Sequence, residues 1–201
     1  MTTTNTRLAI DARNLLVLPD NHIAAEVKLI PRADFESTRQ SRGRKLDGDW
    51  EFARQSGTPY GMMRRILLSP KRMPCTAPPW GRLLAIDAVT GAQKWAVPLG
   101  RLYFGQNKPS TPAEWGSIAL GGPIVTAGGL VFQAGTLDNA VHAFDVETGK
   151  ELWRGELPTS ARATPMTFEG PDGKQYLVIA AGSHQPAGNQ PLGDYVVAFS
   201  L

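Results

Sequence analysis

The 201-residue chain is 42% hydrophobic and 19% charged, which argues against a disordered polymer, and its 21 Gly and 16 Pro residues favour a turn-rich all-β fold. Most of the formal net charge of +3 comes from Arg and Lys residues between Lys28 and Arg72, without the interleaved aromatic side chains of a base-stacking surface, so we expect no nucleic-acid partner. The single cysteine, Cys75, excludes a disulfide within the chain. The sequence shows no signal-peptide pattern and no apolar run long enough to span a bilayer.

The first predicted unit is split in the sequence. Its first two strands are expected at residues 14–19 (NLLVLP) and 24–30 (AAEVKLI), and its outer hairpin at residues 81–99. We therefore assign this unit to residues 8–30 plus 81–99. The roughly fifty residues in between, 31–80, are predicted to form an irregular insertion, and such long insertions usually serve a function or are disordered.

Two further units follow. Residues 100–160 contain a lead-in segment and four predicted strands at 122–127, 130–135, 140–145 and 150–156, separated by turns rich in Gly, Asn and Asp. Residues 161–201 contain three predicted strands, at 163–170, 175–183 and 195–201. A unit of four antiparallel strands is the size of one propeller blade, so the last unit is predicted to lack one strand.

An internal repeat links the first two units. Residues 84–95 (LAIDAVTGAQKW) match residues 142–153 (HAFDVETGKELW) at an offset of 58. In each copy a strand ends at Asp, Thr-Gly forms a tight turn, and a Trp follows on the return strand. We predict that Asp87 and Asp145 stabilise these turns, and that Trp95 and Trp153 pack between neighbouring sheets rather than against a cofactor.

Together the units predict part of a β-propeller with about three blades. Three blades cannot close a ring, because propellers typically need roughly 4–8. Both ends would expose unpaired strands and apolar blade faces. We therefore expect the chain to be a fragment whose partners are the remaining blades, in the same or a separate chain.

The repeated Ala-x-Asp-x-x-Thr-Gly-x-x-x-Trp pattern resembles the tryptophan-docking motif in the eight-bladed propellers of pyrroloquinoline quinone (PQQ)-dependent dehydrogenases. Other segments resemble, in order, the last third of the membrane-bound glucose and quinate/shikimate dehydrogenases of that family. These segments are Leu29-Ile30-Pro31-Arg32, Gly57-Thr58-Pro59-Tyr60, Leu68-Ser69-Pro70, Pro74-Cys75, Pro78-Pro79-Trp80-Gly81, Leu120-Gly121-Gly122-Pro123, Thr126-Ala127-Gly128-Gly129, Gly135-Thr136-Leu137-Asp138 and Gly193-Asp194-Tyr195. The resemblance extends from about Arg13 to Leu201.

This resemblance implies oxidation of a sugar or cyclitol hydroxyl at a PQQ bound with Ca²⁺ or Mg²⁺. Electrons would pass to ubiquinone, with the propeller in the periplasm and associated with the inner membrane. In this family a carboxylate base removes the alcohol proton, and that base belongs to earlier blades. We therefore expect no catalytic residue in this chain and no activity from the chain alone.

The resemblance also marks candidate site residues. His184 matches a histidine that lies near the substrate in glucose dehydrogenases, although Ser183 replaces a glycine of the usual Gly-Gly-His; a loop histidine capping a strand end is the structural alternative. Asp138 matches an aspartate near the PQQ and metal site, where a carboxylate suits a hard cation, but Asp is also common in hairpin turns for purely structural reasons.

The backbone at Leu120 and Gly121 is a further candidate, because missing side chains permit close approach to a cofactor. Glycines that begin a strand explain the same pattern. His22 and His142 have no metal-like spacing to other ligands, and we interpret both as structural.

Two alternatives to a dehydrogenase segment remain open. One is a non-catalytic propeller scaffold that binds proteins, which predicts neither the specific segments at 57–81 nor His184. The other is one half of a split enzyme, whose halves would associate through the exposed blade faces.

Overall fold

The computed structural model describes residues 8–44, 50–71, 73–102, 111–183 and 192–200. These residues are mostly β-strand, with one α-helix, and they form two compact units. One unit lies within Ile23–Ala77, and the other combines residues before Ile23 with residues after Ala77. No helix in the described ranges is long and apolar enough to cross a membrane.

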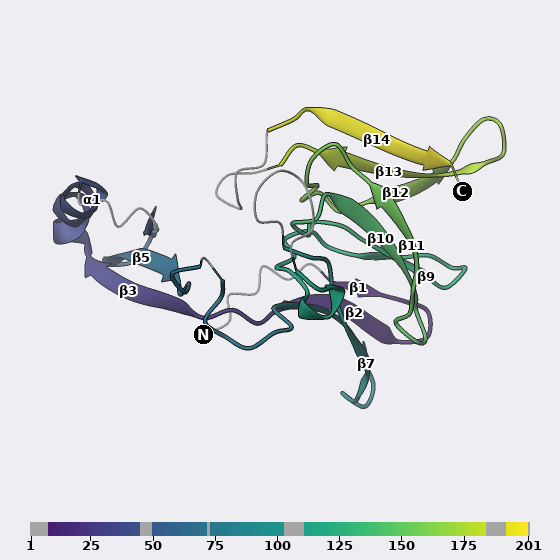
Figure 1. The fold of residues 1–201 in the computed structure, drawn as a ribbon, viewed down its shortest axis with the longest axis horizontal. Helices are drawn as coiled ribbons and strands as arrows, with labels where there is room; N and C mark the ends of the chain where they lie inside the picture. The colour runs from purple at the N-terminus through teal and green to yellow at the C-terminus, as the bar shows by residue number, and fades with distance from the viewer. Residues whose placement is uncertain (1–7, 45–49, 72, 103–110, 184–191, 201) are drawn as a thin grey trace. The chain divides into compact units, whose positions relative to one another are not determined.

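The smaller unit is a three-stranded sheet with one helix (Figure 1). Its strands β3 (Ala25–Pro31), β5 (Tyr60–Ile66) and β4 (Glu51–Arg54) pair in the order β3-β5-β4. A 3₁₀ turn, η1 (Arg32–Asp34), leads into α1 (Phe35–Arg44). Phe35 packs against Ile30 and Met63, and Gly61 permits this contact because a Cβ there would lie 2.2 Å from the Phe35 ring.

This unit corrects two expectations. The predicted strand at 24–30 exists, but it pairs with β5 and not with the hairpin at 81–99. The predicted irregular insertion at 31–80 contains β4, β5 and α1. The physical reason is a local core: Ile30, Phe35 and Met63 bury one another, so this segment folds without using the first sheet of the larger unit.

The larger unit contains three antiparallel sheets. The first has β1 (Ala9–Ile10), β2 (Leu15–Asn21), β6 (Gly81–Asp87) and β7 (Gln93–Pro98), in the order β1-β2-β6-β7. The second has β8 (Ile124–Val125), β9 (Leu130–Gln133), β10 (Ala140–Asp145) and β11 (Glu151–Glu156). The third has β12 (Met166–Glu169), β13 (Gln175–Ala181) and β14 (Tyr195–Ser200). A short 3₁₀ turn, η2 (Ala113–Trp115), precedes β8.

The four predicted strands of the second sheet and the three of the third are confirmed. In the first sheet β2 pairs with β6, and the short strand β1, on the other edge of β2, completes the four strands in place of residues 24–30. None of the sheets formed by the described strands is closed, and the number of blades in the whole propeller stays a prediction.

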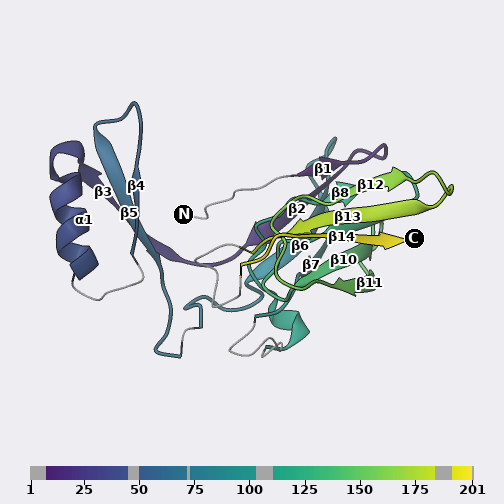
Figure 2. The same cartoon turned by 90° about the horizontal axis from the view of Figure 1, so that it is seen from above.

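The three sheets of the larger unit stack in chain order, with the second sheet between the other two (Figures 1 and 2). Period-2 alternation gives the second sheet two apolar faces. One face contributes Val131 and Phe144 to a core shared with the first sheet, and the other contributes Phe132 and Val141 to a core shared with the third.

Both copies of the repeat form the predicted hairpin turn. Asp87 Oδ1 accepts hydrogen bonds from the backbone N–H groups of Val89 at 3.0 Å and Thr90 at 2.9 Å. Asp145 Oδ1 accepts in the same way from Glu147 and Thr148. The N–H of Thr90 and that of Val89, opposed by partial desolvation, lower the pKa of Asp87 to about 2. The turn-stabilising role predicted for both aspartates is therefore confirmed.

Candidate functional site

Four connections of the larger unit meet at one end of its sheets. Leu120 N–H, before β8, donates to Gly135 O, after β9, at 3.0 Å. Leu157 N–H, after β11, donates to Asn139 O, before β10, at 2.8 Å, and Ser183 N–H, after β13, donates to Ser160 O at 2.8 Å. Because antiparallel strands alternate in direction, these connections lie at the same end, opposite the Asp-x-x-Thr-Gly turns.

The close approach of Leu120-Gly121 to the segment after β9 explains two glycines. Gly135 has a φ of +88°, and a Cβ on it would lie 2.2 Å from Gly121 N. A Cβ on Gly121 would lie 2.9 Å from Ala134 O and 3.2 Å from Ala163 O. Packing of backbone on backbone therefore accounts for Gly121, and its contact with a cofactor stays a prediction.

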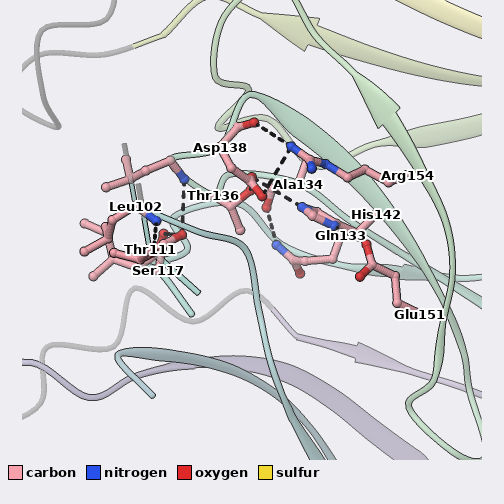
Figure 3. A network of polar contacts seen from close by, with 12 residues as sticks. Leu102, Thr111, Ser117, Gln133, Ala134, Thr136, Asp138, His142, Glu151 and Arg154 are labelled. Carbon is pink, nitrogen blue, oxygen red and sulfur yellow. Dashed lines mark hydrogen bonds and ion pairs between the residues drawn. The ribbon is translucent and has the colours of Figure 1, made fainter. Parts of the chain in front are cut away.

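A buried polar cluster centres on Asp138, which is 1% exposed (Figure 3). Thr136 Oγ1 donates to Asp138 Oδ1 at 2.5 Å. His142 Nε2 lies 3.3 Å from the same oxygen, and His142 Nδ1 lies 2.7 Å from Glu151 Oε1. Arg154 Nη2 donates to the backbone carbonyl of Asp138 at 3.2 Å and lies 3.8 Å from Oδ2. We call Thr136, Asp138, His142, Glu151 and Arg154 the Asp138 cluster.

The register of the sheet assembles this cluster. Gln133 on β9, His142 on β10 and Arg154 on β11 are direct cross-strand neighbours, so their side chains share one face. That face packs toward the first sheet. Gln133 Nε2 donates to Gly121 O at 3.1 Å, which ties this face of β9 to the Leu120-Gly121 segment.

The cluster is strongly polarised. Burial disfavours an imidazolium, but hydrogen bonds and charge from Asp138 and Glu151 outweigh it and raise the pKa of His142 to about 9. For Asp138, burial opposes ionisation, yet His142, Thr136 and Arg154 together lower the carboxyl pKa. The hydrogen bond to His142 likewise lowers the pKa of Glu151. At neutral pH the chain therefore holds an imidazolium between two carboxylates.

Three buried polar atoms in or beside the cluster, Gln133 Oε1, Asn139 Oδ1 and Arg154 Nε, have no hydrogen-bond partner within the described ranges. Buried polar groups are normally satisfied, so such atoms mark places where bound water or another group completes the structure. The end of the sheets where the four connections meet therefore has hydrogen-bonding capacity beyond what the described residues use.

Two residues of this region were not candidates from the sequence. The structure places His142, interpreted above as structural, in the Asp138 cluster between Asp138 and Glu151, and this contact does not test that interpretation. The other is Arg162, a half-buried residue in the connection between β11 and β12, where burial lowers the pKa of the guanidinium. Arg162 lies in the same connection as Ser160, whose carbonyl accepts a hydrogen bond from Ser183 N–H. The next residue, Ala163, has its carbonyl close to Gly121. Aligning the predicted strands at 140–145 and 150–156 as a hairpin would have placed His142 opposite Arg154, and this pair of polar residues is the signal for the cluster.

The remaining predicted site residues are only partly placed. His184 lies outside the described residues, although Ser183 before it is fixed to Ser160. Within the described ranges, no three His, Cys, Asp or Glu side chains are grouped to hold a metal ion, so the metal role of Asp138 stays a prediction. Trp95 and Trp153 lie away from this end: Trp95 Nε1 donates to Val146 O at 2.9 Å, and Trp153 packs on Phe199.

The stacked antiparallel sheets of the larger unit are typical of β-propeller blades. Residues 5–177 match the family model described as PQQ: Glucose/ethanol/alcohol dehydrogenase, beta-propeller domain. The chain belongs to this PQQ β-propeller family.

Curated relatives agree with this assignment. The chain is 40% identical over 178 residues to the quinoprotein glucose dehydrogenase of Escherichia coli, a match covering 87% of this chain and 22% of the relative. It is 39% identical to a probable quinate dehydrogenase (quinone) of Xanthomonas campestris pv. juglandis, over 90% of this chain and 23% of the relative. The chain thus spans less than a quarter of the length of these relatives.

Solved structures show the same fold. A quinohemoprotein alcohol dehydrogenase from Comamonas testosteroni has a TM-score of 0.53 at 27% identity, covering 88% of this chain and 22% of that protein. A europium-containing methanol dehydrogenase also has a TM-score of 0.53, at 25% identity, covering 87% of this chain and 24% of that protein.

Proposed function

We propose that this chain forms part of the cofactor-facing wall of a PQQ-dependent oxidoreductase that oxidises a sugar or cyclitol hydroxyl. The buried Asp138 cluster carries the proposal, because it places ionised, hydrogen-bonded groups where the four connections meet. Family membership and relatives named as glucose and quinate dehydrogenases support it. We further propose, from the family resemblance alone, a periplasmic location at the inner membrane and ubiquinone as electron acceptor.

The residues present fit part of a PQQ site. PQQ is a planar quinone with carboxylate groups, so it needs close backbone approach, hydrogen-bond donors and cations. The chain offers buried glycine backbone at Gly121 and the half-buried Arg162. Bound PQQ would accept the hydride of the substrate alcohol, while these residues would orient the cofactor and exclude water.

The described residues do not fit a divalent-cation site by themselves. Asp138 is the one carboxylate of the Asp138 cluster in these connections, and its Oδ1 already binds Thr136 and His142. Ca²⁺ and Mg²⁺ take six or more oxygen ligands. We therefore propose that any cation depends on ligands outside the described residues.

A segment exchange tests the proposal. The 178-residue match in the E. coli glucose dehydrogenase would be replaced by the corresponding part of this chain. We expect the folded chimera, given PQQ and Ca²⁺ or Mg²⁺, to bind PQQ and to reduce a dye with glucose or quinate. Asp138→Asn in the chimera should weaken PQQ binding about 10-fold or more. The 201-residue chain alone should give no PQQ-dependent dye reduction.

The outcomes separate the competing functions. A chimera with native-like circular dichroism and a cooperative thermal transition that binds no PQQ contradicts the proposal and favours a non-catalytic propeller. PQQ binding that is unchanged by Asp138→Asn contradicts the role of Asp138 alone. Turnover by the isolated 201-residue chain would overturn the expectation that catalysis needs residues outside it.

A further inference from the structure

One chain of contacts joins the loop end of the second sheet to its outer strand. Asp138 precedes β10, His142 lies within β10, and Glu151 begins β11. The His142 ring bridges the two carboxylates, 3.3 Å from Asp138 and 2.7 Å from Glu151. The His142 side chain is 4% exposed and Asp138 1%, whereas the Glu151 side chain is 47% exposed. A buried carboxylate is thus held through an imidazole by a carboxylate at the surface.

The hairpin does not need this bridge in order to fold. In the repeat, His142 corresponds to Leu84, and Glu151 corresponds to Gln93. The first copy nevertheless forms the same strands, with the same register shift after its Ala. Leu84 is 9% exposed, so an apolar side chain packs well at this position.

A buried charged bridge at this position need not make the fold more stable than a leucine would. Desolvation of buried charges consumes much of their attraction, and hydrophobic replacements of such pairs are often equally stable or more stable. The bridge therefore calls for an explanation other than folding. Its geometry supplies one, because three groups act on a single carboxylate.

We propose that His142 is a positioning residue that holds the Asp138 carboxylate in one orientation at the loop end by linking it to Glu151. Thr136 and Arg154 contact Asp138 from two other directions, so the carboxylate has little freedom to rotate. A fixed carboxylate meets a ligand without reorganisation, which is how preorganised groups gain their effect. The inference rests on the proposed function, because it gives Asp138 a cofactor to meet.

The first test uses the full 201-residue chain and needs no cofactor. We expect nuclear magnetic resonance at neutral pH to show two slowly exchanging ring N–H protons for His142. Glu151→Gln should shift the Nδ1 proton and broaden it. Glu156→Gln is the matched control, since Glu156 is an exposed glutamate on the same strand, and it should leave both signals unchanged. Rapidly exchanging His142 ring protons in the wild-type chain would overturn the bridge.

The second test uses the chimera described above and measures the Kd for PQQ. His142→Leu, which copies the first hairpin, should raise this Kd about 10-fold, as the loss of an outer hydrogen-bond partner typically does. Glu151→Gln should raise it by a smaller factor, because Glu151 acts on Asp138 only through His142. His142→Gln, which retains a donor, should recover part of the affinity, and Glu156→Gln should have no effect.

Controls distinguish the failure of this inference from that of the proposed function. If Asp138→Asn weakens PQQ binding but His142→Leu and Glu151→Gln do not, positioning by His142 is wrong and the function stands. If Asp138→Asn has no effect either, the role of Asp138 fails. Should His142→Leu not fold, the surface variant Glu151→Gln still decides the question, and an unchanged Kd in it contradicts the inference.

Discussion

The two copies of the repeat fold alike but differ in what surrounds them. Each forms a hairpin with an Asp-capped turn and a glycine at positive φ, Gly91 at +74° and Gly149 at +71°. Trp95 of the first copy is 8% exposed and donates to Val146 O in the turn of the second copy. Trp153 of the second copy is 38% exposed and packs edge-on against Phe199, with ring centroids 5.1 Å apart. The tryptophan of the same motif is therefore buried in the first copy and partly exposed in the second.

The copies also differ in chemistry on equivalent faces of their hairpins. Leu84, Gln93 and Ala96 of the first copy correspond to His142, Glu151 and Arg154 of the second. The motif fixes the hairpin, and positions outside it are free to carry either an apolar core or a charged bridge. Polar residues at such positions are therefore better indicators of a site than the repeat itself.

The largest expected difference between the two copies is the loss of stability when each tryptophan is replaced by alanine. Trp95→Ala should lower the free energy of unfolding by about 3–5 kcal/mol, because it leaves a cavity between two sheets. Trp153→Ala should cost about 1–2 kcal/mol, since this ring is already partly exposed. Urea unfolding of the full chain measures both. Trp95→Phe isolates the hydrogen bond to Val146 O and should cost about 1–2 kcal/mol. Equal losses for the two alanine variants would show that the packing difference does not matter.

The charged bridge should make the second copy sensitive to pH in a way that the first is not. The pKa of His142 rises from 6.5 to about 9, so its stabilising contribution is complete below pH 6.5 and is lost as pH rises through 9. The pKa values of Asp138 and Glu151 fall below 3.8 and 4.5, so their contributions are present above these values and are lost at lower pH. Stability from the cluster is therefore greatest between about pH 4.5 and 6.5.

The alkaline limb provides the measurement. At about 1.4 kcal/mol per pKa unit, the loss between pH 6.5 and 9 is at most on the order of 3 kcal/mol. His142→Leu, which gives the second copy the residue of the first, should flatten the unfolding free energy over this range. A variant that retains the full alkaline decrease would assign it to groups other than His142.

Sequence reasoning predicted the strands but not every pairing. Turns such as Gly128-Gly129 and Thr148-Gly149 delimit the strands of the second sheet, and glycine punctuation is a strong local signal. Residues 24–30 show strand periodicity, but periodicity says which face is buried and not which strand is the neighbour. β3 pairs with β5 because Phe35, at the start of α1, completes a local core with Ile30 and Met63.

The candidate site shows the same limit. The resemblance to a family motif marks Asp138, whereas His142 has no metal-like spacing to other ligands and is interpreted from the sequence as structural. A register shift after Ala143 pairs Phe144 with Glu151 and brings that carboxylate to the imidazole. A bulge of this kind changes the cross-strand partners and leaves no mark in the alternation of residues.

The smallest expected difference between the two copies is the cost of alanine at the turn glycines Gly91 and Gly149. Alanine at either position must adopt positive φ, which costs about 1–2 kcal/mol. At Gly91 nothing lies within 4 Å of the new Cβ, whereas at Gly149 it would lie 2.6 Å from the Trp95 ring. Gly149→Ala should therefore lower the free energy of unfolding by about 1–2 kcal/mol more than Gly91→Ala, through overpacking.

A double-mutant cycle identifies the source of this difference. In a Trp95→Ala background the clash is absent, so Gly149→Ala and Gly91→Ala should then lower the free energy of unfolding equally, by the cost of the backbone alone. Urea titrations of Gly149→Ala and Gly91→Ala, each in the wild-type and in the Trp95→Ala background, supply the coupling energy. If Gly149→Ala stays the more costly change without Trp95, the difference between the two copies arises in the turns themselves and not in the packing of one sheet against the next.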